Sequence, residues 1–320
     1  MTQPVAVVTG AFSYTGRAIA HELLVRGHVV KTLTRRPPEP GGFGDSVQAF
    51  PFTFDDPPKL VEVLRGAETV YNTYWVRFER RRVGFSAAVT NTKTLIQASL
   101  EAGVRRFVHI SITNPSSSSS LPYFRGKALV EDAVVQSGLS YAIVRPSVIF
   151  GRGDVFINNI AWILRRFPVF AIPGDGSYRI QPVHVDDVAR LSVELGTTPQ
   201  EVVRDAAGPE IFTFEEMVRT IAFAIGRPRR LIHCPPVAAL AMARLIGLLV
   251  RDVVLTRQEL EGLMANLVVS SEDPIGQIRL TDWLRENSEN LGRQYASEIG
   301  RNFKRPAETG DRGNAHPDGT

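Results

Sequence analysis

Residues 4–16, PVAVVTGAFSYTG, predict a buried strand that runs through a glycine turn into a helix. The strand is an unbroken apolar run from Val5 to Val8, which is typical of a parallel strand covered on both faces. Gly10 permits a sharp exit from this strand, and Gly16 permits close packing of the helix. Because the first N–H groups of a helix bind anions, the turn is a candidate site for a dinucleotide pyrophosphate.

One of the three glycines expected in such a turn is replaced, since Ser13 stands at the middle position. Serine adds only a small hydroxyl, which can donate a hydrogen bond to a phosphate oxygen. A glycine turn alone also occurs in plain strand–helix connections, so its context decides the interpretation. Here it lies between a valine strand and an amphipathic helix at 17–26, and this context favours dinucleotide binding.

The composition is that of an ordinary globular protein, with 43% hydrophobic and 22% charged residues in 320. The single cysteine, Cys234, cannot form an internal disulfide, and the first strand follows Met1 closely. We therefore expect a cytoplasmic protein without a signal peptide. The net charge of +4 is spread over scattered arginine pairs, so we expect no nucleic-acid partner.

The end of the second predicted strand, 29–33, indicates which cofactor the chain prefers. The NAD form of this fold has a carboxylate here, whereas this chain has Thr34, Arg35 and Arg36. Two guanidinium groups suit a 2′-phosphate, so the sequence predicts NADP, with NAD as the alternative. A solvated turn before Pro37 is the other interpretation of the two arginines.

Strands and helices alternate through the first half of the chain. Further strands are predicted at 47–52, 68–73, 107–111 and 141–144, and helices at 59–65, 83–102 and 123–136. This alternation predicts an α/β fold with a doubly wound parallel sheet. Ligands of such sheets bind at the carboxyl ends of the strands, where Asp55 and Thr73 stand. His109 lies inside a strand and is interpreted as a core histidine.

Tyr123 and Lys127 are four residues apart in a predicted helix and therefore lie on one of its faces. An ammonium group and a cofactor cation stabilise phenolate, so a tyrosine in this setting can exchange protons near neutral pH. The segment that follows the next strand, 145–151, is predicted to be irregular.

The second half predicts a looser substrate lobe. We divide the chain into an NAD(P)-binding domain at 1–150, a smaller C-terminal substrate lobe at 151–305 interleaved with it, and a disordered tail at 306–320. His184 is interpreted mainly as a structural hydrogen-bonding residue, with a substrate contact as the alternative. Asp186 and Asp187 are interpreted as helix-start residues, so we expect no metal site.

The helix predicted at 237–250, VAALAMARLIGLLV, is apolar on almost every side. It is shorter than the roughly 20 residues that span a bilayer, so we expect no transmembrane segment. We interpret it as a buried helix. The alternatives are a wall of an apolar substrate pocket, a face of a homodimer, or a contact with a membrane surface. A final polar helix is predicted at 283–303.

Taken in order, these motifs resemble the extended and atypical branches of the short-chain dehydrogenase/reductase superfamily. The resemblance rests on TGAFSYTG (9–16), TRR (34–36), SITN (111–114), YFRGK (123–127), RPSVIFG (145–151) and PVHVDDVA (182–189). The chain is most similar to the nucleoside-diphosphate-sugar epimerase-like, complex I accessory-subunit-like and nitrogen-metabolite-repression regulator-like proteins of that superfamily.

The resemblance implies roles for single residues. It places the cofactor on Gly10, Phe12, Ser13, Tyr14, Thr15, Gly16, Arg35, Arg36, Asp55, Thr73, Lys127 and Pro146. It also implies that Tyr123 is the acid/base and that Lys127 holds the nicotinamide ribose. The family's paired serines are here Ser111-Ile112-Thr113, so either hydroxyl is a candidate for polarising the substrate.

The sequence thus predicts an NAD(P)-dependent oxidoreductase or epimerase that acts at a hydroxyl or carbonyl carbon of a small substrate. The alternative is a non-catalytic dinucleotide-binding sensor or accessory subunit. Ser13, Ile112 and Ala88 support this alternative, because Ala88 stands where the family often has an asparagine.

Overall fold

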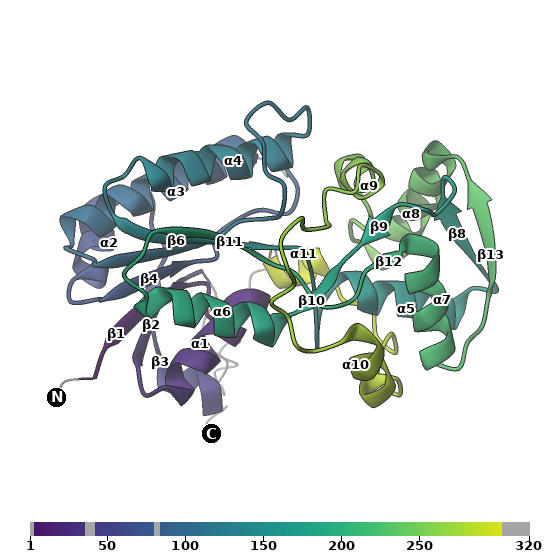
Figure 1. The fold of residues 1–320 in the computed structure, drawn as a ribbon, viewed down its shortest axis with the longest axis horizontal. Helices are drawn as coiled ribbons and strands as arrows, with labels where there is room; N and C mark the ends of the chain where they lie inside the picture. The colour runs from purple at the N-terminus through teal and green to yellow at the C-terminus, as the bar shows by residue number, and fades with distance from the viewer. Residues whose placement is uncertain (1–2, 36–41, 80–83, 303–320) are drawn as a thin grey trace, which may run out of the picture.

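A computed structural model describes residues 3–35, 42–79 and 84–302 of the chain. A seven-stranded parallel sheet organises the first half (Figure 1), in the order β11-β6-β5-β4-β1-β2-β3. The strands are β1 (Val5–Thr9), β2 (Val29–Thr34), β3 (Val47–Pro51), β4 (Thr69–Asn72), β5 (Arg106–Ile110), β6 (Ser140–Pro146) and β11 (Val202–Ala206). The predicted doubly wound α/β fold is confirmed.

Helices cover both faces of this sheet (Figure 1). One face carries α1 (Tyr14–Val25) and α6 (Val185–Thr197), and the other carries α2 (Pro57–Leu64), α3 (Phe85–Glu101) and α4 (Pro122–Val135). Neighbouring residues of β1 enter the two different cores, since Val8 packs with Ile19 and Val188, whereas Val7 packs with Leu60. This two-sided burial explains why the sequence of β1 is continuously apolar.

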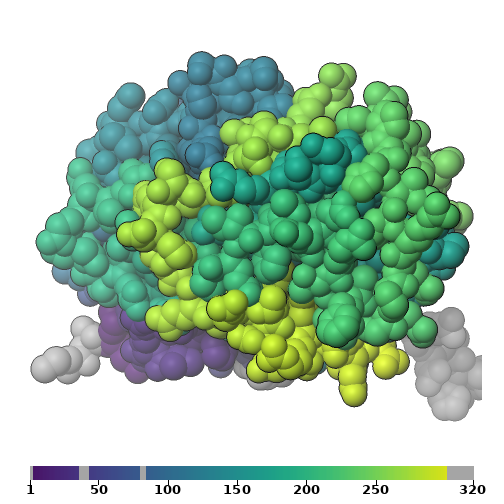
Figure 2. Space-filling view, turned by 45° about the vertical axis from the view of Figure 1, so that its right-hand side comes forward, coloured from purple at the N-terminus to yellow at the C-terminus, as the bar shows by residue number. Residues whose placement is uncertain are grey.

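The second half forms a lobe with a core of its own (Figures 1 and 2). Its helices are α5 (Phe156–Arg166), α7 (Phe214–Ala224), α8 (Pro236–Val250), α9 (Arg257–Met264), α10 (Leu280–Asn287) and α11 (Glu298–Asn302). Its strand pairs are β7 (Val148–Phe150) with β10 (Pro182–His184), β8 (Val169–Pro173) with β13 (Arg230–Cys234), and β9 (Arg179–Ile180) with β12 (Phe212–Thr213). Figure 2 shows this green and yellow half packed directly against the first half.

The sheet places the candidate site at one edge. The strand order reverses between β1 and β4, so the carboxyl ends of these two strands border the crevice where ligands of doubly wound sheets bind. Two elements from beyond residue 150 belong to this half: β11 is the edge strand of the sheet, beside β6, and α6 packs on one face of the sheet. β11 was not predicted.

Several predictions of local structure were wrong. Residues 145–151 are not irregular, because β6 continues to Pro146 and β7 spans Val148–Phe150. The helix predicted at 283–303 ends at Asn287, and the chain turns at Gly292, where φ is +70°. A Cβ on Gly292 would lie 2.5 Å from the backbone of Trp162, so tight packing on α5 sets this turn.

The interpretation of α8 as a buried helix was also wrong. Its buried residues are Ala239, Ala243 and Gly247, whereas Leu248 and Leu249 are each 76% exposed. In the described part of the chain, no helix is long and apolar enough to cross a bilayer. The predicted tail at 306–320 and the predicted cofactor contact of Arg36 lie outside the described residues.

Candidate functional site

The turn between β1 and α1 is closed by contact between two backbone segments. Gly10 has a φ of +71°, and the N–H of Ser13 donates to the Gly10 carbonyl over 2.7 Å. A Cβ on Gly16 would lie 2.2 Å from that same carbonyl oxygen. The predicted sharp exit at Gly10 and close approach at Gly16 are therefore confirmed.

The start of α1 suits an anion. Ser13 is the N-cap of α1, but its side chain makes no capping hydrogen bond, and the first turn contains no acidic residue. The N–H groups at a helix start carry partial positive charge and bind phosphate or carboxylate groups. The backbone geometry of this turn therefore fits the pyrophosphate of a dinucleotide.

Hydrogen bonds join the tips of β1 and β4 beside this turn. The backbone N–H groups of Thr73 and Tyr74 both donate to Thr9 Oγ1, over 2.8 and 3.0 Å. Thr73 Oγ1 in turn donates to the Thr9 carbonyl. These bonds hold Thr73 next to Gly10, where the cavity described next begins. Asn91 Nδ2, on α3, donates to the Tyr74 hydroxyl over 2.9 Å.

A cavity of about 450 Å³ lies between the glycine turn and the second half of the chain. From the first half, its walls include Ser13, Tyr14, Thr15, Thr73, Trp75, Arg77, Ile112 and Tyr123. From the second half, they include residues 154–156 and parts of the segment 255–268. The structure thus brings Tyr123 and the glycine turn to one cavity, although they are more than a hundred residues apart in the sequence.

Tyr123 is surrounded by aromatic rings. The Tyr123 ring centroid lies 5.9 Å from that of Trp75 and 5.7 Å from those of Phe85 and Phe124. Burial raises the pKa of the Tyr123 phenol above its usual value, and the negative charge of Glu259 acts in the same direction. The sequence predicted a lowered pKa. In the protein without a bound coenzyme, desolvation raises the pKa of the phenol by more than nearby positive charge lowers it.

Lys127 lies in the same helix but is buried behind aromatic side chains. Its ammonium donates to the Ile110 carbonyl over 2.8 Å and lies 4.8 Å from the Trp75 ring centroid. Burial lowers the pKa of Lys127 to about 7. Trp75 therefore contacts both Tyr123 and Lys127. Trp75 was missed in the sequence, although Gly126 was a signal, because a Cβ there would lie 2.9 Å from the Trp75 ring.

The two hydroxyls predicted to polarise the substrate do not line this cavity. Thr113 is fully buried, and its hydroxyl donates to the Leu267 carbonyl over 3.0 Å. Ser111 Oγ is buried and has no hydrogen-bond partner among the described residues. Ile112, between them, does line the cavity. Thr113 thus holds the loop that follows α9, which the sequence could not indicate.

Four further residues predicted to bind the cofactor do not line this cavity. Arg35, at the end of β2, and Asp55, after β3, are both exposed. Phe12 follows the turn at Gly10 and makes an edge contact with Phe43, with centroids 6.2 Å apart. Pro146 is buried at the end of β6, where its carbonyl accepts from the N–H of Thr113 over 3.1 Å.

The histidines and acidic residues that the sequence singled out have structural partners. His109 is buried and lies 3.1 Å from Asn72 Nδ2 through its Nδ1, and burial lowers its pKa well below the usual value, so its interpretation as a core histidine is confirmed. His184 caps α6 by accepting from the N–H of Asp186 over 3.2 Å. Asp187 accepts from the N–H groups of residues 277 and 278.

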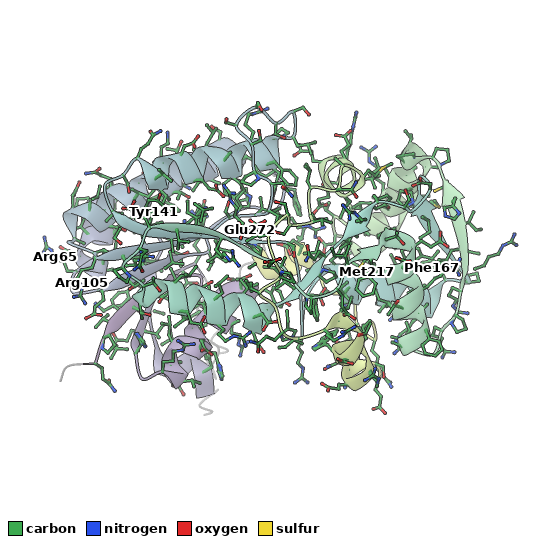
Figure 3. The ribbon with its side chains drawn as sticks, viewed as in Figure 1. Arg65, Arg105, Tyr141, Phe167, Met217 and Glu272 are labelled. Carbon is green, nitrogen blue, oxygen red and sulfur yellow. The ribbon has the colours of Figure 1, made fainter. Side chains whose placement is uncertain are left out.

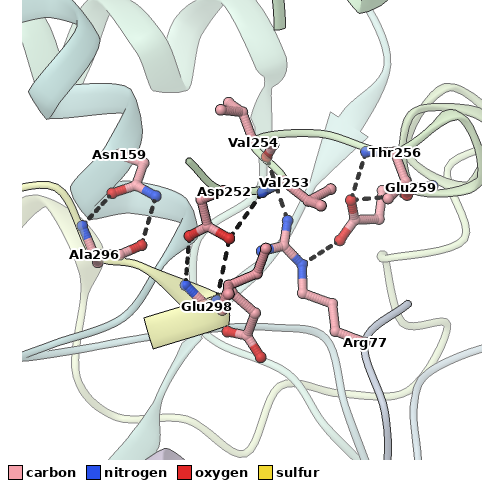
Figure 4. A network of polar contacts seen from close by, with 10 residues as sticks. Arg77, Asn159, Asp252, Val253, Val254, Thr256, Glu259, Ala296 and Glu298 are labelled. Atoms are coloured by element: carbon pink, nitrogen blue, oxygen red, sulfur yellow. Dashed lines mark hydrogen bonds and ion pairs between the residues drawn. The ribbon is translucent and has the colours of Figure 1, made fainter. Parts of the chain in front are cut away.

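A polar network from the second half closes the other side of the cavity (Figure 4). Arg77 Nε donates to Glu259 over 2.5 Å, and Arg77 Nη2 donates to the Val254 carbonyl over 3.3 Å. Glu259 also completes a capping box with Thr256 at the start of α9. The Asp252 carboxylate accepts from the N–H groups at the start of α11 (Figure 4). Arg77 thus ties the loop after β4 to the second half.

Comparisons with known proteins agree with this geometry. Residues 10–154 match the family described as NAD(P)H-binding. The chain is 28% identical over 251 residues to the NADH dehydrogenase [ubiquinone] 1 alpha subcomplex subunit 9, mitochondrial, of Arabidopsis thaliana, covering 75% of this chain and 62% of that protein. The chain therefore spans a little over three fifths of the length of this relative.

Two further matches broaden the comparison. The chain is 27% identical over 250 residues to the ceramide reductase of Caulobacter vibrioides, covering 76% of this chain and 77% of that protein. The solved structure of Citrobacter sp. triphenylmethane reductase superposes with a TM-score of 0.72 at 14% identity, over 88% of this chain and 98% of that one. At this identity, the superposition shows a shared fold.

Proposed function

The chain belongs to the extended short-chain dehydrogenase/reductase superfamily, and on that basis we propose that it is an NAD(P)-dependent oxidoreductase or epimerase acting at a hydroxyl or carbonyl carbon. One observation carries the proposal: Tyr123 lines the same cavity as Ser13, Tyr14 and Thr15 of the glycine turn. A bound dinucleotide supplies hydride chemistry at its nicotinamide ring. The relative named as a reductase supports this class of reaction.

Burial raises the pKa of the Tyr123 phenol and so keeps it protonated in the protein without a ligand. Tyr123 carries its proton at neutral pH and donates it to the oxygen of a substrate carbonyl. A bound coenzyme would supply the hydride to the carbonyl carbon. The part of this chain is to protonate the carbonyl oxygen from Tyr123, whose phenolate then takes up a proton from water. The oxidation of an alcohol runs through the same groups in reverse.

Lys127 acts through its neighbours in this proposal. Family resemblance assigns it to the nicotinamide ribose, whereas its ammonium here contacts the Ile110 carbonyl and the face of Trp75. Trp75 packs edge-on against Tyr123. We therefore assign Lys127 as a positioning residue that orients Trp75 and, through it, the phenol.

The test uses ligand-stripped protein. Calorimetry with NADPH and NADH measures binding, and nicotinamide absorbance follows turnover on a panel of ketones and secondary alcohols. Tyr123→Phe is expected to lower kcat/KM by about 100-fold or more, because it removes the acid, while the coenzyme Kd stays within about twofold. No binding of either coenzyme, or full turnover by Tyr123→Phe, would overturn the proposal.

Tyr141→Phe is the matched control for this test. Tyr141 lies at the start of β6, at the end of the sheet away from the lobe residues Phe167 and Met217 (Figure 3), and does not line the cavity. The same loss of one hydroxyl is expected to leave both turnover and coenzyme binding unchanged there.

A preference for NADP is part of the proposal and is tested separately. Arg35 follows β2 and is exposed to solvent, in reach of an anion that approaches this strand end. Replacing both Arg35 and Arg36 by alanine is expected to weaken NADPH binding about tenfold, because charged hydrogen bonds to the 2′-phosphate are lost. The Kd for NADH is expected to stay the same. An unchanged ratio of the two Kd values would exclude this preference.

A non-catalytic dinucleotide-binding subunit or sensor is the second candidate. Two observations favour it: a relative is named as a subunit of NADH dehydrogenase, and neither Ser111 nor Thr113 lines the cavity. Such a protein would bind the coenzyme with the same affinity in wild type and Tyr123→Phe. It would cause no absorbance change on any member of the substrate panel.

A further inference from the structure

A second cavity, of about 380 Å³, adjoins the cavity of Tyr123. Its volume falls within the range of roughly 300–1,000 Å³ that is typical of small-ligand sites. The two cavities share the wall residues Arg77, Val155, Phe156, Leu255 and Leu263. The two cavities therefore lie next to one another, with these five side chains between them.

The lining of the second cavity favours an apolar ligand. Apart from Arg77, Asn159 and Tyr178, every lining residue is apolar. The Asn159 amide is already occupied, since it donates to and accepts from the backbone of Ala296 over 3.0 and 2.9 Å. The guanidinium of Arg77 is held by Glu259 at the shared wall. Among the described lining atoms, Arg77 Nη1 and the Tyr178 hydroxyl are buried without a hydrogen-bond partner. A sugar or a second nucleotide has many more polar groups than these two atoms could pair, whereas an alkyl chain would lose no hydrogen bonds on entering.

The second cavity opens to the surface along α8. Leu245 and Leu249 line it and are 63% and 76% exposed, and Val169 on β8 lines it and is 42% exposed. α8 and β8 lie side by side at the end of the lobe far from the sheet (Figure 1). The inner end of this cavity is the wall that it shares with the Tyr123 cavity. Its outer end is rimmed by apolar side chains that face solvent.

We propose that the substrate is a long-chain amphiphile whose hydroxyl or carbonyl carbon lies at Tyr123 and whose alkyl chain fills the cavity under α8. The proposal rests on the proposed function, because it assigns a substrate class to the same site. It also gives the exposed leucines of α8 a role, as the apolar rim through which the chain enters. The polar end of the substrate faces the cavity that holds Ser13, Thr73 and Arg77.

The experiment measures binding and turnover of linear 2-alkanones that differ only in length, from 2-hexanone to 2-tetradecanone. Each added methylene that enters the cavity is expected to lower Kd by up to about fourfold, which corresponds to ~0.8 kcal/mol. The gain ends when the chain fills the cavity. Kd values that do not depend on chain length would overturn the proposal.

Two tryptophan variants on α8 distinguish the cavity from general hydrophobic adhesion. Leu248 and Leu249 are neighbours with the same exposure of 76%, but of these two only Leu249 lines the cavity. Leu249→Trp is expected to weaken binding of the longest ketone at least tenfold and of 2-hexanone less than twofold. Leu248→Trp is expected to change neither. Equal losses in both variants would contradict the proposal.

Turnover in the same samples separates this inference from the proposed function. If short ketones are reduced but affinity does not increase with chain length, the proposed alkyl-binding role of the second cavity is wrong and the proposed oxidoreductase function stands. If affinity increases with chain length but no ketone causes oxidation of NADPH or NADH, the proposed function is wrong and the alkyl-binding role of the second cavity stands.

Discussion

The glycine turn of the first half and helix α8 of the second half both place small residues on their buried side. They differ in their large residues, which are buried after the turn and exposed on α8. In the turn, Gly16 is required because any Cβ would lie 2.2 Å from the Gly10 carbonyl oxygen. In α8, the small residues Ala239, Ala243 and Gly247 face inward at intervals of four, and a Cβ on Gly247 would lie 2.6 Å from the Asp252 carbonyl oxygen. In both places, small residues mark a close approach.

The large residues around these contacts differ. The turn is followed by Ile19 and Leu23, which α1 buries against the sheet. Several large residues of α8 instead remain exposed, with Leu245 and Leu248 exposed by 63% and 76%. The first half also buries charged groups, among them the ammonium of Lys127. Small residues thus locate a packed face, whereas hydrophobicity alone does not.

The largest effect is expected at Gly16, where a tolerated side chain would contradict the close approach of the two backbone segments. Gly16→Ala is expected to lower the free energy of unfolding by about 3 kcal/mol, because α1 must move away from the backbone of Gly10. Gly27→Ala is the control, since Gly27 has a φ of +81° but open space around it, so about 1 kcal/mol is expected. Urea unfolding measures both values, and equal losses would show that the close approach does not dictate the residue.

The buried ammonium of Lys127 predicts a dependence of stability on pH. Its pKa is about 7 in the folded protein and near 10.5 in the unfolded chain, so between these values only the unfolded chain holds the proton. The free energy of unfolding therefore rises as the pH rises through this window, by up to about 1.4 kcal/mol per pH unit from this group. Below pH 7 the full destabilisation remains.

Lys127→Met is expected to lose this rise, whereas Lys93→Met, at an exposed position of α3, is expected to keep it. Urea unfolding at pH 7.5 and pH 9 measures the slope for each of the three proteins, because both pH values lie between the pKa of Lys127 in the folded protein and that in the unfolded chain. A slope in Lys127→Met equal to that of the wild type would mean that the ammonium is not desolvated.

How much the sequence revealed depended on how far apart the contacting residues are. The turn was predictable, since Gly10 and Gly16 contact one another over six residues and their spacing records that contact. Tyr123 and Lys127 were found through their helical spacing, but not the ring of Trp75 that touches both. Trp75 is about fifty residues earlier in the chain, and no local pattern connects it with Tyr123.

The second half was harder to predict for the same reason. The partner of Thr113 is the carbonyl of Leu267, and that of Arg77 is Glu259, so both bonds join distant segments. For α8, the apolar sequence predicted burial, because a helix that is apolar on every side has no face marked for solvent. The interval of four between its small residues was the available signal.

The smallest expected effect tests the exposed face of α8. Leu248→Gln is expected to change the free energy of unfolding by less than about 0.5 kcal/mol, because Leu248 is 76% exposed and loses little packing. Ala243→Gln, on the buried face, is expected to cost about 2 kcal/mol, because a polar amide must be placed among the apolar residues that line the cavity under α8. Thermal and urea unfolding of both variants gives the comparison. A loss at Leu248 as large as that at Ala243 would mean that this face of α8 is covered in solution, by a second copy of the chain or by another segment. The face that the small residues mark would then not be the only packed one.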